Sequence, residues 1–134
     1  MGRRWRSGTA GCAPGAALGF TYAWARRDPA AILAAVRAGH TYLSAGPYLA
    51  WHPWPNCLAA PSPDRLSIEV ARLGAPADLR LMHDGRPIAR ETVAAGGVVA
   101  LDPPAGTHGG WYRAELYRPG TDDLLAITNP VWYE

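Results

Sequence analysis

Four histidines are the residues whose type would suit metal chemistry: His40, His52, His83 and His108. No two of them stand at the i, i+4 spacing of a helical metal pair or at the HxH spacing of a strand. His52 has Cys57 close by in the sequence, but two ligands are fewer than the four that a structural zinc site needs. The sequence therefore predicts no metal site and no catalytic residue in this chain, with His40 and His52 as the candidates for a metal ligand.

Each histidine also has a role that needs no ligand. His40 follows a helical stretch, where a cationic side chain interacts favourably with the helix dipole. His83 precedes a turn signal and His108 stands among glycines, so both are expected as turn residues. A GxSxG elbow, a phosphate-binding glycine loop and a paired-carboxylate motif are missing from the sequence, which argues against the enzyme classes that use them.

Tyr48, Trp51 and Trp54 form an aromatic cluster in a proline-rich stretch. Flat apolar rings with polar edges suit the stacking of sugar rings, so the cluster is a candidate site for carbohydrate or protein. The alternative is that these rings pack at a junction between two parts of the molecule, because prolines stiffen the loop that carries them. Both interpretations are open at this point.

The elements that must position these residues begin near residue 20. Residues 1–19 are broken by glycines and are expected to be loose. Residues 20–25 and 40–44 have the composition of strands, and the stretch between them is helical. A connection that contains a helix is too long for a hairpin turn, so we expect a β-α-β unit over residues 20–46, with parallel strands and the helix packed across them.

The helix in this unit has clear end signals. Asp28 is the expected N-cap, Pro29 occupies the first helical position, and Gly39 follows the last turn. One helix does not cover both faces of a parallel sheet, so we expect this unit to be part of a larger sheet structure.

The rest of the chain has the pattern of an all-β domain. Residues 47–63 are expected to be a linker loop, since their prolines are incompatible with a central strand. Over residues 64–134, alternating apolar side chains and recurring turn residues predict about six short strands. Asp84-Gly85 is the strongest hairpin signal. The expected fold class is mainly β: a short β-α-β unit followed by a small antiparallel immunoglobulin-like β-sandwich.

Composition limits the function classes further. The chain has 134 residues, 13 basic residues that are all arginine, and a net charge of +2. The arginines are scattered, so no nucleic-acid partner is expected. No apolar run approaches the ~20 residues that span a bilayer, so no membrane partner is expected either. Cys12 and Cys57 are expected as unrelated thiols, and a cytoplasmic location is expected.

Several segments, taken in order, resemble the end of a known protein family. Thr21–Ala25, Asp28–Leu33 and Arg37–Pro47 are similar to the closing segment of a PHP (polymerase and histidinol phosphatase) domain of the carbaryl-hydrolase-like branch. In that branch the pattern RAG-x-x-Y-x-S-x-GP is followed by a small β-sandwich. Three later segments are similar to that appended domain: Asp84–Arg86, Gly110–Leu116 and Ile127–Trp132.

The resemblance implies a distorted β/α barrel before residue 20, in which His, Asp and Glu hold a divalent metal. That metal would activate a water molecule for the hydrolysis of phosphoester, ester or carbamate bonds. The family's last ligand motif, Asp-x-His after Gly-Ser, falls near Gly2–Arg6, where arginines stand instead. Guanidinium groups have no lone pair for a cation, so no family ligand is carried over to this chain.

The leading hypothesis is therefore a C-terminal fragment or accessory domain of a PHP-type hydrolase, inactive by itself and without a cofactor of its own. Its partner would be a PHP barrel, present upstream in the same chain or supplied by another chain. The alternative hypothesis is a stand-alone β-sandwich that binds carbohydrate or protein through Tyr48, Trp51 and Trp54.

Overall fold

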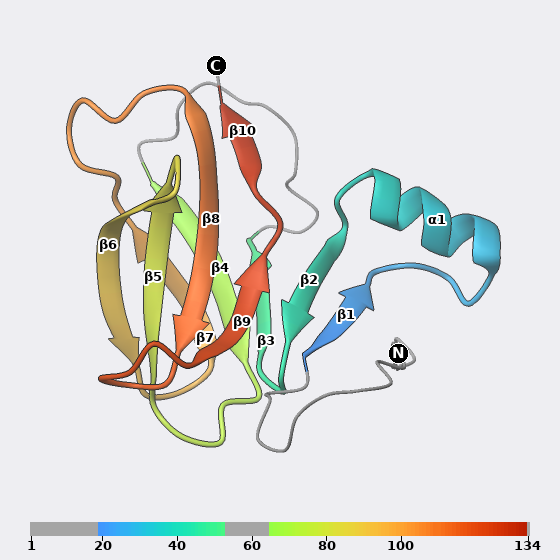
Figure 1. The fold of residues 1–134 in the computed structure, drawn as a ribbon, viewed down its shortest axis with the longest axis horizontal. Helices are drawn as coiled ribbons and strands as arrows, with labels where there is room; N and C mark the ends of the chain where they lie inside the picture. Colours follow the sequence, from blue (N-terminus) through green and yellow to red (C-terminus); the bar gives the residue numbers. More distant parts are fainter. Residues whose placement is uncertain (1–18, 53–64, 134) are drawn as a thin grey trace.

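The computed structural model describes residues 19–52 and 65–133 (Figure 1). Trp54, both cysteines and the segment Gly2–Arg6 lie outside these residues, as does most of the N-terminal segment expected to be loose. The described elements are β1 (Phe20–Ala23), α1 (Pro29–Arg37), β2 (Thr41–Ser44), β3 (Tyr48–Trp51), β4 (Leu66–Ala71), β5 (Ala77–His83), β6 (Arg86–Val93), β7 (Gly97–Leu101), β8 (Gly110–Tyr117), β9 (Leu124–Thr128) and β10 (Val131–Tyr133).

Two antiparallel sheets pack against each other. The larger sheet has the order β1-β2-β9-β8-β5-β6, with β10 also paired to β8, and the smaller sheet has the order β3-β4-β7. The predicted alternation is visible in β4, where Leu66, Ile68 and Val70 are buried and their neighbours are not. Together with inward-facing residues of the larger sheet, these side chains form one core. The prediction of a mainly β fold with a small sandwich is confirmed.

The Asp84-Gly85 turn joins β5 to β6, as the sequence predicts. Both residues have positive φ, 46° and 82°, which is the backbone shape that the tightest hairpin turns require. The Asp84 carboxylate also accepts a hydrogen bond of 3.1 Å from the Trp111 N–H, which fastens the turn to the neighbouring β8.

The predicted parallel pairing of the first two strands is wrong. β1 and β2 are antiparallel neighbours, with Phe20 opposite Ser44 and Ala23 opposite Thr41. The helix does not cross the sheet; it lies beyond the end of the strand pair (Figure 1). The chain turns back at once after α1, because the His40 N–H donates to the Ala35 carbonyl at 2.8 Å and the Trp24 N–H donates to the His40 carbonyl at 3.0 Å. The segment that contains α1 therefore connects β1 to β2 as a long hairpin loop, which is held together by backbone hydrogen bonds within the segment.

The ends of α1 are as predicted. The Asp28 carboxylate accepts a 2.8 Å hydrogen bond from the Ala31 N–H, Pro29 is the first helical residue, and Gly39 has a φ of 73°. Within α1 only Ala35 is buried. We call β1, α1 and β2 together the arm. Since β2 pairs with β9, the arm extends the larger sheet of the sandwich.

The predicted linker loop contains a strand. β3 occupies residues 48–51, and it pairs with β4 so that Tyr48 lies opposite Ala71 and Trp51 opposite Ile68. Pro47 and Pro53 flank these four residues without interrupting them, and β3 is an edge strand, where flanking prolines are tolerated.

A polar junction joins the arm to the sandwich between the end of β9 and the start of β10. Both strands run along one side of β8 and are separated by Asn129 and Pro130. At this break the Asn129 side-chain amide donates to the Gly39 carbonyl at 2.7 Å and to the Thr41 hydroxyl at 2.6 Å. The Asn129 carbonyl in turn accepts a 2.9 Å hydrogen bond from the Trp51 indole. One residue therefore connects β10, the arm and β3.

Replacement of Asn129 by alanine is expected to lower the free energy of unfolding by about 1–3 kcal/mol, because part-buried acceptors lose their donor. Urea denaturation followed by tryptophan fluorescence measures the change. Glu91→Ala, at an exposed position of β6, is the control and should stay within about 0.5 kcal/mol of the original chain. Equal effects of the two substitutions would contradict the role assigned to Asn129.

Candidate functional site

The four histidines do not assemble into a metal site. His52 Nδ1 lies 3.9 Å from a Glu69 carboxylate oxygen, and His83 Nε2 lies 2.7 Å from the Gly109 carbonyl. His40 is next to the C-terminus of α1, and His108 is in an exposed loop. Within residues 19–52 and 65–133, no three side chains of His, Cys, Asp or Glu come together as metal ligands would.

The three aromatic residues singled out in the sequence have different surroundings. Trp51 is 3% exposed, and its ring lies in the core with its N–H bonded to Asn129, so it has no face to offer a ligand. Trp54 lies outside the described residues. Tyr48 is half-buried and borders a cavity of about 100 Å³.

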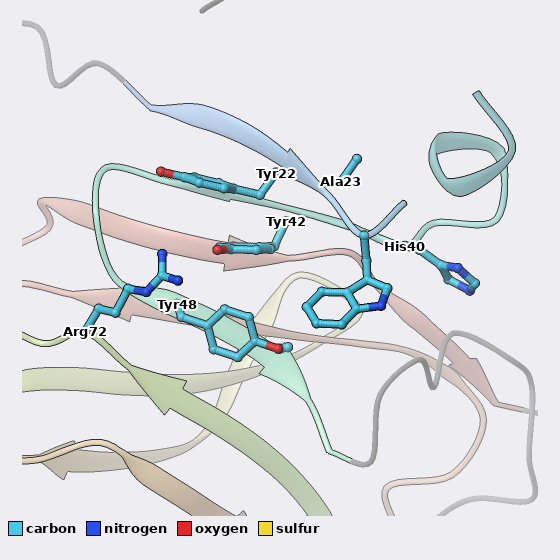
Figure 2. A pocket seen from close by; sticks show the side chains of 8 residues that line it. Tyr22, Ala23, His40, Tyr42, Tyr48 and Arg72 are labelled. Carbon is cyan, nitrogen blue, oxygen red and sulfur yellow. The ribbon is translucent and has the colours of Figure 1, made fainter. Parts of the chain in front are cut away.

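This cavity lies where the arm meets β3, and it is the candidate site (Figure 2). Three segments contribute to it: the arm, β3 and the residue that follows β4. The lining residues are Tyr22, Ala23, Trp24, His40, Tyr42, Tyr48, Ala50 and Arg72.

Strand pairing places the aromatic walls. Tyr22 and Tyr42 are directly opposite each other across β1 and β2, and their rings stack with centroids 4.8 Å apart and an interplanar angle of 13°. Tyr48 approaches Tyr42 edge-on, with centroids 5.4 Å apart and an angle of 76°. Both arrangements are favourable for aromatic rings. The antiparallel register of the arm is therefore what creates the stacked wall.

Arg72 is the cationic residue of the cavity. It follows β4 directly and has a φ of 57°, a left-handed backbone conformation that is costly for a residue with a side chain. Its exposed side chain reaches toward the hydroxyl of Tyr42 (Figure 2). The salt bridges within the described part of the chain do not include Arg72.

The hydroxyls of Tyr42 and Tyr48 are hydrogen-bond donors over a wide pH range. Burial raises the pKa of Tyr42 to about 12; the nearby Tyr22 adds to this shift and the charge of Arg72 opposes it. The pKa of Tyr48 is also raised, by burial and then by the charge of Glu69. Both hydroxyls therefore stay protonated well above neutral pH. The lining offers aromatic surface, hydroxyl donors and one guanidinium group. Ligand-binding sites are lined by groups of these kinds.

The sequence analysis missed most of this site. Tyr22, Trp24 and Tyr42 lie in segments that the sequence predicts only as strands, and the sequence assigns no role to Arg72. The one available signal was the aromatic content of residues 20–24, with Trp24 now 66% exposed at the cavity. The exposed Trp24 ring adds a flat apolar surface beside the cavity.

A second aromatic pair lies outside this site. The ring centroids of Trp111 and Trp132 are 6.5 Å apart, and the Arg113 guanidinium lies 5.2 Å from the centroid of the Trp111 ring. They are on β8 and β10, and the cavity lining does not include them.

The substitution Arg72→Gly is expected to raise the free energy of unfolding. Glycine adopts positive φ without the cost of about 1–2 kcal/mol that a side chain brings. Its greater freedom in the unfolded state offsets part of this, which leaves a gain of about 0.5–1 kcal/mol in urea denaturation. The control is Arg86→Gly in β6, where φ is not positive and a loss of about 0.5–1 kcal/mol is expected. A loss of similar size for Arg72→Gly would show that the Arg72 side chain supports the fold.

The raised pKa of Tyr42 makes stability depend on pH in the alkaline range. The unfolded chain loses the Tyr42 proton near pH 10 and the folded chain near pH 12, so the contribution is complete below pH 10 and is lost as the pH rises to about 12. Tyr42→Phe should therefore show a shallower fall in Tm between these pH values, with little change at neutral pH. Thermal melts across the range, with tyrosinate absorbance as a second readout, measure it; parallel curves for the two proteins would contradict the assignment.

None of the described residues forms a helix long and apolar enough to cross a lipid bilayer. Comparison with known proteins yields no matching family model, no matching curated protein and no matching solved structure.

Proposed function

We propose that this chain is the C-terminal accessory domain of a PHP-type metal-dependent hydrolase, and that its arm docks on the catalytic barrel. In this proposal the barrel holds the divalent metal and performs hydrolysis, and it is either part of a longer chain or a separate one. The sandwich provides a packing surface and no catalytic group of its own.

The observation that carries the proposal is the apolar surface of the arm. Seven large apolar side chains are markedly exposed in the described residues, and four of them belong to the arm or to the residue after β1: Trp24, Leu33, Val36 and Leu43. Leu33 and Val36 are three residues apart on α1 and therefore share one face of the helix. Leu43 is on the strand that joins the arm to the sandwich. Apolar side chains left uncovered in this way favour contact with another protein surface.

The contacts of the motif residues also support the proposal. Two of the stretches that carry the resemblance, residues 37–47 and Ile127–Trp132, meet in the fold through the hydrogen bond from Asn129 to the Gly39 carbonyl. In the first stretch the Ser44 hydroxyl accepts a 2.9 Å hydrogen bond from the Gly46 N–H and donates to the Pro47 carbonyl. These residues shape the arm and its attachment, which is the part that a neighbouring barrel would contact.

The described residues do not fit a catalytic metal. A divalent ion of the hydrolytic type needs several carboxylate or imidazole ligands converging on one point, and within residues 19–52 and 65–133 neither His40 nor His52 belongs to a group of three such side chains. A metal implied by the resemblance would have to be held by the barrel, and we derive no catalytic step for this chain.

Association with a barrel tests the proposal. The chain is expected to form a complex, seen by size-exclusion chromatography, with a PHP-type barrel encoded at the same locus. Val36→Arg should weaken this complex at least ten-fold, because a charge would be buried in the contact. Val98→Arg is the matched control, since Val98 is as exposed as Val36, at 52% and 51%, but lies in β7 of the other sheet.

Two outcomes would contradict the proposal. The first is equal weakening by the two arginine substitutions, or a barrel that does not associate. The second is hydrolysis of an aryl phosphodiester by the purified chain alone with added Mn²⁺ or Zn²⁺, at a rate that survives alanine substitution of His40 and His52.

A further inference from the structure

The cavity between the arm and β3 has a donor-rich end. The Arg72 guanidinium carries five N–H donors and no acceptor, and the protonated hydroxyl of Tyr42 lies beside it (Figure 2). Five other arginines of the described residues pair with carboxylates: Arg65, Arg80, Arg90, Arg113 and Arg118. Arg72 is not in these pairs, so its charge is available to an external anion.

The backbone at Arg72 supports a role for its side chain. A non-glycine residue at a φ of 57° is held in a conformation that glycine adopts without strain. Such strained residues concentrate at binding and active sites, where the position of the side chain matters more than its cost. Here the strain directs a guanidinium group to the rim of an aromatic cavity.

The walls define the rest of the ligand. The ring of Tyr48 and the exposed Trp24 offer flat surfaces that suit a single ring, beside the stacked pair of Tyr22 and Tyr42. The volume of about 100 Å³ is smaller than the ~150 Å³ cavity that encloses benzene. A ligand would therefore enter with one ring or part of it, and the remainder would stay outside.

Charge sets the orientation of such a ligand. Glu69 lies opposite Ala50 across β3 and β4, and its negative charge acts on Tyr48. His52 is 3.9 Å from Glu69. An anionic group is thus attracted at the Arg72 end and repelled at the Glu69 side, so it would lie beside Arg72 and the Tyr42 hydroxyl.

We propose that this cavity binds a carboxylate carried on a six-membered ring, with the carboxylate paired to Arg72 and the ring against the tyrosine walls. The fork of the guanidinium group matches the two oxygens of a carboxylate. Two sources share this chemistry: aromatic carboxylic acids and uronic acid units of polysaccharides. Trp24 belongs both to the exposed surface of the arm and to this cavity, but Leu33 and Val36 on α1 are not in the cavity lining, and the ligand proposal does not depend on the accessory role proposed above.

Titration of the full chain with benzoate and with glucuronate, followed by NMR spectra of the tryptophan indole groups and by calorimetry, tests the site. Phenol and glucose are the neutral counterparts that lack the carboxylate. At least one carboxylate is expected to bind ten-fold more tightly than its counterpart and to shift the indole signal of Trp24. Tighter binding of benzoate assigns the site to aromatic acids, and tighter binding of glucuronate assigns it to uronic acids.

Arg72→Gln should weaken this binding at least ten-fold, and Arg86→Gln, on an exposed strand end away from the cavity lining, should leave it unchanged. Arg72→Gly serves as a second variant, because it removes the guanidinium group at a position where glycine suits the backbone. The proposal is overturned if neither carboxylate binds better than its neutral counterpart, or if both Arg72 variants retain the affinity of the original chain.

Discussion

The side-chain amide of Asn129 makes two hydrogen bonds at the break between β9 and β10, the two strands that pair with the same side of β8. Pro130 cannot continue the ladder of backbone hydrogen bonds, so the chain breaks between β9 and β10. The Thr128 hydroxyl accepts the hydrogen bond of the Ala114 N–H at 3.0 Å, which satisfies a buried donor at the break. Asn129 is then free to bind the arm. Loss of these hydrogen bonds would leave the arm held mainly by the pairing of β2 with β9.

The sequence predicts best those elements that local chemistry determines. The Asp84-Gly85 turn, the caps of α1 and the alternation in β4 depend on neighbouring residues, and all three are present. The pairing of β1 with β2 was predicted wrongly, because a helix between two strands usually signals a parallel crossover. β3 was missed because prolines at both ends hid a strand of four residues. The hydrogen bonds that turn the chain back at His40 and the pairing of β3 with β4 are properties of the folded backbone, which residue composition does not reveal.

The candidate site was harder to predict for the same reason. Tyr48, predicted as part of an aromatic cluster, borders the cavity, but Trp51 from the same cluster is a core residue. Tyr22, Tyr42 and Arg72 come from three separate strands or strand ends, and no motif links them. The strained backbone conformation of Arg72 could not be predicted from the sequence, because an arginine that follows a strand gives no signal of a positive φ. The PHP resemblance stays a hypothesis.

The low burial of the arm has a further consequence for the cavity. α1 buries a single alanine, and the arm is held mainly by strand pairing with β9 and by Asn129. Segments with so few buried contacts open at a lower free energy than the core of a domain. Because Tyr22 and Tyr42 belong to the arm, the hollow exists only while the arm is closed. Whatever occupies it would by mass action hold the arm shut, so that occupancy and local folding become one coupled equilibrium.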